Sequence, residues 1–576
     1  MTTSIRLDRD LELKTRDGTI LRADALRPEI QAKVPAIVIR TPYDKNGAYS
    51  TALYPGLTLA KAGFAVVAQD VRSRFASEGS SWPPLDLWNV EGPDGYDTIE
   101  WVASMPWCDG NVGMAGTSYL AECQYAAASL RPPSLKAIAP AMHTIGADTF
   151  WTFMLMLESI VLTYAAGMAI DGLDRRMPTG EANFAHVAVA MEVLRDPPVA
   201  SKFLPVAQRP LFTLPGVATY EDVLGMIGRT FMHTGGRGEG LFEVPALMTT
   251  GWYDSQLGGG SMFRVFRDHG ANDLARNATR MIIGAWTHNY QLAFVGEWGL
   301  SALGSAEASF VPKAHIDFFS RHLRDDDTVL DLPVVRYFVM GANEWKVADD
   351  WPLPSTDYRR MYLASGGKAN SLHGDGRLTW DAPSGGSAPD TFTYDPADPT
   401  PSVGGRVMYT GGSTLAGPFN QQRIEQREDV LVYTGDAMES PLELVGPVEV
   451  HLWASSSAVD TDFVAKLCDV TPDGASMNLA DGIVRAQVRD GWETRSLLEP
   501  GRPYEFRIDL GATGHVVRPG HRLRVTITSS GFPHWERNMN TGGRPGADAA
   551  GVVAHQTVFH DADMPSFIVL PVQHAS

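Results

Sequence analysis

The chain has 576 residues, of which 44% are hydrophobic and 20% are charged. This composition excludes a disordered polymer, and the length predicts several globular domains, because single hydrophobic cores stop growing at about 250–300 residues. The formal net charge of −19 would repel a phosphate backbone, and no cluster of Lys and Arg reverses it. We therefore expect no nucleic-acid partner.

The amino-terminal residues and one apolar stretch bear on the compartment. Residues 1–6 lack the basic flank and the apolar run of a secretory signal, so a cytoplasmic protein is expected. The stretch 150–170 is apolar but carries Glu158 near its middle and has no basic flank. This pattern favours a buried helix or a lid, and no contact with a membrane is expected.

Short apolar runs alternate with helical segments over residues 1–145, the pattern of a parallel sheet covered by helices on both faces. Residues 36–39 and 64–68 are two such runs, and the second leads into polar residues. A helix is expected over 95–103 and another strand over 111–115. Because ligands bind at the carboxyl ends of strands in open α/β sheets, that edge is the expected place of a functional site.

Three further segments follow this first part of the core. Residues 146–240 lose the strand pattern and are rich in Met, Leu and Ala, which predicts a helical cap inserted into the sheet. Alternation resumes over 241–350, with strands expected at 244–250 and 280–283. Residues 351–576 consist of short alternating strands separated by Gly, Pro, Asp and Asn turns. They predict a separate β-sandwich or jelly-roll domain.

The cysteines point to no special chemistry. Cys108, Cys123 and Cys468 are widely separated and do not have the spacing of a metal site. They are expected to be free thiols.

A serine lies between an expected buried strand and a helix in the sequence GMAGTSYLA, residues 113–121. The glycine two residues before Ser118 fits a nucleophile elbow, the tight strand-to-helix turn that lifts a hydroxyl above a sheet. Leu120 occupies the place of the usual second glycine. The motif alone therefore leaves open a serine that only caps a helix.

Two later strand ends offer the partners that a nucleophilic serine needs, namely a histidine base and a carboxylate that orients it. The strand at 244–250 leads to Asp254, and the strand at 280–283 leads to His288. The order Ser, Asp, His is that of α/β-hydrolases. Taken singly, Asp254 could cap the next helix and His288 could be an ordinary loop histidine. Together with Ser118 they predict a catalytic triad.

An oxyanion hole needs two hydrogen-bond donors. The backbone N–H of Tyr119, directly after the serine, supplies one. The hydroxyl of Tyr43, in the loop after an early strand, is a candidate for the second. Because a tyrosine beside a proline more often serves packing, the residues alone leave the role of Tyr43 open.

Several long motifs, spread over nearly the whole chain, resemble those of the bacterial cocaine esterase family, whose relatives include X-Pro dipeptidyl-peptidases and α-amino-acid ester hydrolases. The motifs are RTPYDK at 40–45, DVRSRFASEG at 70–79, WCDGNVG at 107–113, GTSYL at 116–120, GWYD at 251–254, WTH at 286–288, SSSAVDTDF at 455–463 and NTGG at 540–543. The resemblance implies an α/β-hydrolase core with an inserted helical cap and a C-terminal jelly-roll. It also implies a triad of Ser118, Asp254 and His288, with Tyr43 as the side-chain donor of the oxyanion hole.

The resemblance bears on the substrate pocket as well. Trp151 matches a pocket aromatic, whereas Gln256 stands where an aromatic wall of the acyl pocket is expected. Val407, Met408 and Tyr409 are expected to roof the site from the β-domain. The sequence is therefore compatible with an aromatic acyl group without requiring one.

The leading hypothesis is hydrolysis of a small-molecule carboxylic ester through an acyl-enzyme, with no metal or organic cofactor. The alternative is an amide or peptide hydrolase, or an α-amino-acid ester hydrolase or acyltransferase. Those enzymes would recognise a substrate ammonium with carboxylates, for which the cap offers Asp148, Glu158, Asp171 and Asp174. A scaffold that has lost activity is disfavoured by the complete set of catalytic residue types. The expected assembly is a homodimer.

Overall fold

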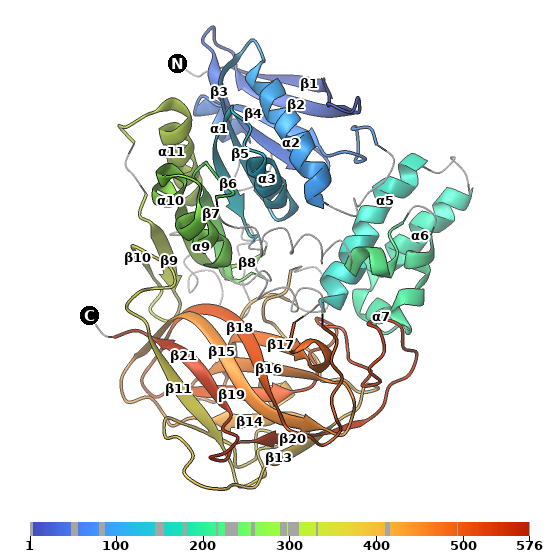
Figure 1. Ribbon diagram of the computed structural model, residues 1–576, viewed down its shortest axis with the longest axis vertical. Coiled ribbons are helices and arrows are strands. Elements are labelled where there is room, and N and C mark those ends of the chain that lie inside the picture. Colours follow the sequence, from blue (N-terminus) through green and yellow to red (C-terminus); the bar gives the residue numbers. More distant parts are fainter. Residues whose placement is uncertain are drawn as a thin grey trace.

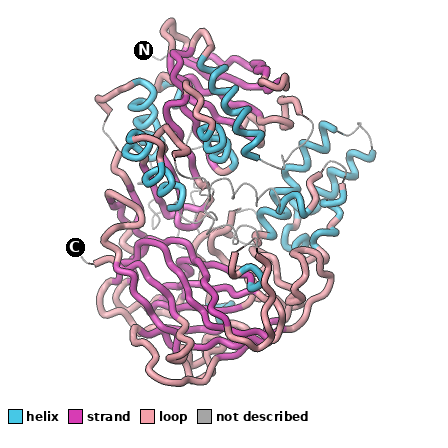
Figure 2. The backbone as a smooth tube through the Cα atoms, viewed as in Figure 1, coloured by secondary structure: helices cyan, strands magenta, loops and turns pink. Residues whose placement is uncertain are grey.

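In the computed structural model, the described residues are 4–47, 56–79, 87–143, 155–176, 181–214, 217–224, 240–254, 260–288, 297, 310–329, 332–408, 415–491 and 494–574. Figure 1 shows a mixed α/β part that begins at the N-terminus and a β-rich part that ends near the C-terminus, with a group of helices beside both. Figure 2 shows the same division, because strands dominate the second part and most helices lie outside it.

The α/β part is built on a sheet that has 10 strands within the described ranges, in the order β1-β2-β4-β3-β5-β6-β7-β8-β9-β10. Neighbouring strands from β4 through β3 to β9 pair in parallel. The pairs β1–β2, β2–β4 and β9–β10 at the two edges are antiparallel. The strands are β1 (Ile5–Lys14), β2 (Ile20–Pro28), β3 (Val34–Thr41), β4 (Ala65–Asp70), β5 (Cys108–Thr117), β6 (Leu135–Ala141), β7 (Leu247–Tyr253), β8 (Arg280–Thr287), β9 (Val335–Val339) and β10 (Glu344–Ala348).

Parallel strands that are covered on both faces carry apolar side chains throughout. Accordingly, every residue of β3, β4, β7 and β8 is buried. Helices α2 (Leu87–Ala103) and α3 (Tyr119–Ser129) pack against each other and against β5. Helix α11 (Phe310–Arg324) lies so close to β5 that a Cβ at Gly113 would be 2.8 Å from the ring of Phe319. The other helices that the structure describes in this part are α1 (Gly56–Lys61), α9 (Gly260–His269) and α10 (Asp273–Ala278).

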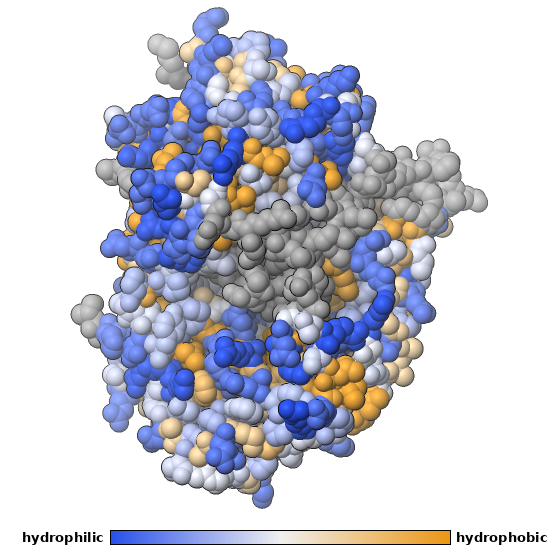
Figure 3. Space-filling view, in the orientation of Figure 1, coloured by the Kyte–Doolittle hydropathy of each residue, from blue (hydrophilic) through white to orange (hydrophobic). Residues whose placement is uncertain are grey.

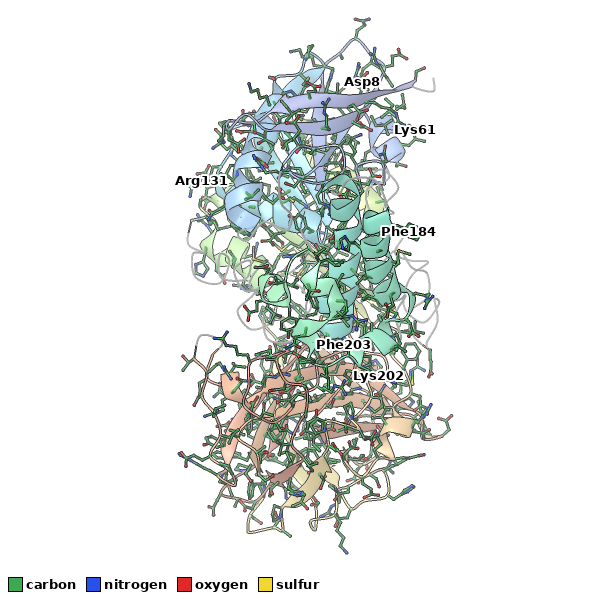
Figure 4. The ribbon with its side chains drawn as sticks, turned by 90° about the vertical axis from the view of Figure 1, so that its right-hand side faces the viewer. Asp8, Lys61, Arg131, Phe184, Lys202 and Phe203 are labelled. Atoms are coloured by element: carbon green, nitrogen blue, oxygen red, sulfur yellow. The ribbon has the colours of Figure 1, made fainter. Side chains whose placement is uncertain are left out.

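A helical insertion separates β6 from β7. It contains the π-helical segment η3 (Leu157–Tyr164), α5 (Ala165–Arg176), α6 (Glu181–Arg195), α7 (Pro197–Ser201) and the 3₁₀ turns η4 (Val206–Gln208) and η5 (Pro210–Thr213). On its outer side Phe184 of α6 is 80% exposed, and Figure 4 shows this residue at the edge of the insertion. Among the helices that the structure describes, none is long and apolar enough to cross a membrane.

The β-rich part holds a second sheet, with 11 strands in the described residues. Its order is β13-β20-β15-β21-β11-β12-β14-β19-β16-β17, and β18 pairs with β15. The elements are β11 (Asp357–Ala364), β12 (Arg377–Thr379), β13 (Asp390–Tyr394), α12 (Gln422–Glu425), β14 (Leu431–Thr434), β15 (Leu442–Ser456), β16 (Asp462–Val470), β17 (Ser476–Arg485), η10 (Ala486–Val488), β18 (Tyr504–Val517), β19 (Arg522–Thr528), β20 (Ala554–Phe559) and β21 (Phe567–Val572). Most of its buried apolar residues form a core separate from that of the α/β part, which Val445 of β15 and Ala512 of β18 join instead.

Backbone hydrogen bonds join the two parts. Met340, directly after β9, donates to Gly514 of β18 at 2.8 Å and accepts from Val516 at 2.8 Å. Apolar residues of the insertion, among them Leu157, also pack with Phe532 and Trp535 of the β-rich part. On the face drawn in Figure 3 hydrophilic residues predominate, in keeping with the apolar side chains gathered in these internal clusters.

The elements expected from the sequence occur with shifted ends. The helix expected at 95–103 is the second half of α2, which begins at Leu87 and has Pro93 inside it. A proline within a helix removes a hydrogen-bond donor, so the sequence pattern places the start of this helix too late. The three cysteines are free and buried, which confirms that prediction. The first sheet ends with β10 at Ala348, and the second begins with β11 at Asp357.

Candidate active site

Ser118 occupies the sharp turn between β5 and α3. Its backbone has φ 63° and ψ −122°, a conformation that residues other than glycine rarely adopt. Its amide donates to the carbonyl of Ala141 in β6 at 2.9 Å, which ties the turn to the neighbouring strand. A strained serine in a strand-to-helix turn is the geometry of a nucleophile elbow.

The missing second glycine of the motif is explained by the packing at Gly116. This residue has φ +144°, and a Cβ placed on it would lie 2.4 Å from the Cβ of Leu120. The close approach of strand and helix therefore depends on the first glycine, and Leu120 fills the space that it leaves. The turn forms without a glycine after the serine.

Asp254 and His288 directly follow the ends of two neighbouring strands. Tyr253 of β7 and Thr287 of β8 are partners in the strand register, and the two site residues directly follow them. Nδ1 of His288 lies 2.8 Å from Oδ1 of Asp254, and both side chains are buried. The next helix that the structure describes, α9, begins at Gly260.

The segment that carries Asp254 is anchored by side chains on both sides of the strand end. The hydroxyl of Tyr253 donates to the carbonyl of Asn478 in β17 at 2.9 Å, and the indole of Trp252 donates to the carbonyl of Phe338 in β9 at 2.7 Å. The carboxylate is thus held by contacts to the first sheet and to the β-rich part.

Tyr43 and Tyr119 are neighbours but differ in environment. Their ring centroids are 6.5 Å apart, and the ring of Tyr164 lies 6.4 Å from Tyr43 on another side. Tyr43 is 41% exposed, whereas Tyr119 is buried and donates its hydroxyl to Glu91 at 2.9 Å. Burial, reinforced by the charge of Glu91, raises the pKa of Tyr119 well above its ordinary value. Only the backbone N–H of Tyr119 is therefore suited to a role in an oxyanion hole.

The loop that carries Tyr43 is fixed by a buried carboxyl. Asp70, at the end of β4, accepts hydrogen bonds from the amides of Lys45 at 2.7 Å and Ala76 at 3.1 Å. Burial raises the pKa of Asp70 to about 6, against these hydrogen bonds, which lower it. The loops after β3 and β4 thus share one anchor.

Asp171, one of the cap carboxylates considered for recognition of a substrate ammonium, contacts the loop after β4 instead. Asp171 of α5 lies 3.5 Å from the buried guanidinium of Arg74 and accepts from the amide of Phe75 at 3.1 Å. Arg74 also donates to the carbonyl of Met168 at 2.8 Å. These contacts dock the cap on the loop after β4.

Most of the other predicted pocket residues lie outside the part of the chain that the structure describes. Trp151, Gln256, Tyr409 and Asp148 lie outside the described residues, as do the side chains of Glu158 and Asp174. Met408 is 4% exposed and packs in the apolar cluster that joins the cap to the β-rich part. Among the described residues, no group of three or more His, Cys, Asp or Glu side chains could hold a metal ion.

Two residues near the site were missed from the sequence. Tyr164 contacts Tyr43, but it lies in an apolar helical stretch in which no motif distinguishes it from core residues. His143 follows β6, and burial lowers its pKa to about 3, with the charge of His288 adding to this effect. Its position two residues after an apolar strand was the available signal, because such strand ends face the site in α/β sheets.

Two family models match the chain. The model of the X-Pro dipeptidyl-peptidase (S15 family) matches residues 17–190, and that of the X-Pro dipeptidyl-peptidase C-terminal non-catalytic domain matches residues 328–569. The first contains Ser118, and the second covers most of the β-rich part.

Two solved structures share the fold over nearly the full chain. An aminopeptidase from a marine sediment archaeon, Thaumarchaeota archaeon, is 22% identical and superposes with a TM-score of 0.76 over 100% of this chain and 97% of its own. An α-amino acid ester hydrolase is 23% identical, with a TM-score of 0.76 over 99% of this chain and 97% of its own. This likeness confirms the predicted α/β-hydrolase fold with a C-terminal β-domain.

Among curated proteins, the cocaine esterase of Rhodococcus sp. (strain MB1 Bresler) is 38% identical over 97% of this chain and 97% of its own. Similarity at this level over the full length of both chains establishes the family predicted from the motifs. The chain belongs to the cocaine esterase family, whose members are serine hydrolases that act on ester bonds.

Proposed function

We propose that Ser118, His288 and Asp254 form the catalytic triad of a carboxylesterase. The observation that carries this proposal is the 2.8 Å contact between Nδ1 of His288 and Oδ1 of Asp254, at strand ends of the same sheet edge as the strained Ser118. A carboxylate on Nδ1 holds the proton there and leaves Nε2 as the base. This is the tautomer that a serine nucleophile requires.

The reaction follows from these roles. His288 takes the proton of Ser118 as the hydroxyl attacks the ester carbonyl, and the imidazolium is stabilised by Asp254. The imidazolium then protonates the leaving alcohol, which leaves an acyl group on the serine. Water, deprotonated by the same histidine, attacks this acyl-enzyme and releases the acid. No metal or organic cofactor takes part.

The oxyanion is held by the Tyr43 hydroxyl and the Tyr119 amide in this proposal. The two residues are in ring contact, and Tyr119 is the first residue of the helix that follows the nucleophile. The anchor at Asp70 holds the loop of Tyr43 in place before substrate arrives. Donors fixed in this way stabilise charge without reorganisation in the transition state.

The proposed substrate is a small-molecule ester with an aromatic or apolar acyl group. The exposed edge of Tyr43 and the ring of Tyr164 supply aromatic surface beside the proposed oxyanion hole. The relative at 38% identity is named for the ester cocaine. The engagement of Asp171 by Arg74 makes recognition of a substrate ammonium by that carboxylate unfavourable.

The test is hydrolysis of a series of p-nitrophenyl esters from acetate to benzoate, with an amino-acid ester and an amino-acid anilide alongside. Ser118→Ala should abolish turnover, and Ser129→Ala, at the far end of the same helix, should leave it unchanged. Retention of full activity by Ser118→Ala would refute the triad. Preference for the amino-acid substrates would assign the enzyme to the amide-hydrolase branch instead.

A further inference from the structure

A second Ser–His–Asp arrangement lies in the β-rich part, outside the proposed triad. Asp390 begins β13, His560 directly follows β20, and Ser387 lies in the loop before β13. Strands β13 and β20 are antiparallel neighbours, and Asp390 is the register partner of Val558. Figure 1 shows both strands in the portion of the β-rich part that lies away from the α/β sheet. The strand pairing therefore brings His560 next to Asp390.

His560 connects the other two residues through its two ring nitrogens. Its Nε2 lies 3.0 Å from Oδ2 of Asp390, and its Nδ1 lies 2.9 Å from Oγ of Ser387. The side chains of His560 and Asp390 are 1% and 0% exposed, whereas Ser387 is exposed. A reagent in solution can therefore reach the serine hydroxyl, while the imidazole and the carboxylate behind it are shielded from water.

The hydrogen bonds of Asp390 determine where the protons of this cluster lie. Its carboxylate accepts from the amide of Ala369 at 2.8 Å and from the hydroxyls of Ser365 and Tyr433 at 2.7 and 2.8 Å. Burial raises the pKa of Asp390, but these hydrogen bonds and that of His560 outweigh burial and hold the pKa below its ordinary value. An ionised carboxylate accepts and does not donate, so Nε2 of His560 carries the proton.

A proton on Nε2 leaves the lone pair of the neutral imidazole on Nδ1. The hydroxyl of Ser387 therefore donates to Nδ1 of His560. This is the protonation pattern of a nucleophilic serine, with a base in front of the hydroxyl and a carboxylate that orients the base. The two nitrogens are exchanged relative to His288, whose Nδ1 faces Asp254. Either nitrogen can serve as the base, because the hydrogen bond at one nitrogen decides the protonation of the other.

Ser365 also contacts this cluster, but on the other side of the imidazole. Its Oγ lies 3.0 Å from Nε2 of His560, which is the protonated nitrogen. Ser365 donates its own proton to Asp390, and its oxygen accepts from the amide of Gly367 at 2.9 Å. The group that receives its proton is thus a carboxylate of low pKa, which is a weak base. Ser387, by contrast, faces a basic nitrogen.

The loop that carries Ser387 is held to the β-rich part by its backbone as well. The amide of Ala562, just after His560, donates to the carbonyl of Gly385 at 3.1 Å. The serine side chain is exposed, so its truncation leaves no cavity in the core. Ser387→Ala should therefore keep the fold, and a change in its reactivity reports on the hydroxyl.

We propose that Ser387 is a second nucleophilic serine, which takes the acyl group of an activated ester with His560 as its general base and Asp390 as the residue that orients the imidazole. Oγ of Ser387 attacks the carbonyl carbon of a phenyl ester, and the hydroxyl proton passes to Nδ1 of His560. The bond between the carbonyl carbon and the phenolic oxygen breaks, and the phenolate leaves with the electron pair. An acyl-serine remains, and the imidazolium releases its proton to solvent.

The experiment treats full-length Ser118→Ala with p-nitrophenyl acetate and follows acetylation of Ser387 over time by mass spectrometry of its peptides. Removal of Ser118 prevents the proposed triad from consuming the reagent. Ser384, which is exposed in the same loop, is the internal reference. General base catalysis contributes about 10²–10⁴-fold, so Ser387 should be acetylated at least about 100-fold faster than Ser384.

Two further variants, made on the same Ser118→Ala chain, test the role of the imidazole. His560→Ala should lower the rate of acetylation at Ser387 by about 100-fold, and Ser384→Ala, the matched control, should leave it unchanged. His560→Ala with Ser118 intact should still hydrolyse esters, which shows that the rest of the chain is folded. If that variant unfolds, the comparison of Ser387 with Ser384 still decides.

Equal acetylation of Ser387 and Ser384, or an unchanged rate at Ser387 in folded His560→Ala, would overturn the proposal. The result is independent of the proposed function, because acetylation is measured in a chain without Ser118. A failure of the proposed triad would appear as ester turnover that survives Ser118→Ala, whereas a failure of this inference would appear as a slow Ser387.

Discussion

The roles proposed for the two tyrosines can be separated by removing one hydroxyl at a time. Tyr43→Phe removes a side-chain donor from the oxyanion hole, and loss of one such donor raises the barrier by about 2.7–4 kcal/mol. Since each 1.36 kcal/mol is a factor of ten, kcat should fall by about 100- to 1,000-fold. Because Tyr43 is 41% exposed, its hydroxyl adds little to folding, and the melting temperature should stay nearly unchanged.

Tyr119→Phe should give the opposite result. Its hydroxyl bonds Glu91, which is buried in an ion pair with Arg40, so its loss leaves a buried carboxylate under-satisfied. We expect a loss of about 1–3 kcal/mol of stability, with kcat retained because the backbone N–H stays in place. The assay combines ester turnover with thermal unfolding. A fall in kcat for Tyr119→Phe as large as that for Tyr43→Phe, or none for Tyr43→Phe, would refute the assignment of donors.

Three further predictions follow from the contacts of the site and the core. Asp254→Asn should lower kcat by about 10⁴-fold with the fold intact, because His288 would then be held in the wrong tautomer; near-normal ester turnover would contradict this. Asp171→Ala should lower the melting temperature and raise KM, since it leaves the Arg74 guanidinium buried with less countercharge and loosens the cap; an unchanged KM would show that the cap docks by other contacts. His315 is buried, and burial lowers its pKa to about 4 from the ordinary 6.5. The unfolded chain therefore takes up a proton that the folded chain refuses, so stability should fall by about 3 kcal/mol as pH drops through this window. The free energy of unfolding, measured with urea at several pH values, should change less with pH in His315→Gln than in the wild type. An identical dependence on pH in both proteins would refute the role of His315.

Much of the site was open to prediction because its residues follow strand ends. Ser118, Asp254 and His288 each come directly after a buried run, and parallel strands bring their carboxyl ends to one edge. The Asp254–His288 contact then depends only on the register of β7 against β8. A sequence gives no register, but a motif on each of two adjacent strands makes this pairing the simplest one.

The residues that were missed have no such pattern. Glu122 lies on a helix whose described side chains from Tyr119 to Ala128 are all buried, so its carboxyl interrupts an apolar face without forming a motif. Its neighbour His143, whose Nε2 lies 3.2 Å from Oε2 of Glu122, is 21 positions further along the chain, as the numbering shows, and belongs to another strand end. The pairing of such positions emerges only when packing brings them together. The same holds for Asp171, whose orientation toward Arg74 could not be read from the cap sequence.

The β-rich part contacts the segment that carries Asp254. Tyr253, one residue before the proposed triad acid, reaches across to Asn478 of β17, so that acid is positioned by a strand more than two hundred residues away. The amide oxygen of the Asn478 side chain in turn accepts from the backbone N–H of Phe419 at 2.8 Å. A displacement of the second sheet would therefore move Asp254 relative to His288. If His288 is the base that we propose, the orientation of its imidazole depends on the docking of both parts. The similarity to the Rhodococcus relative likewise extends through the C-terminal domain.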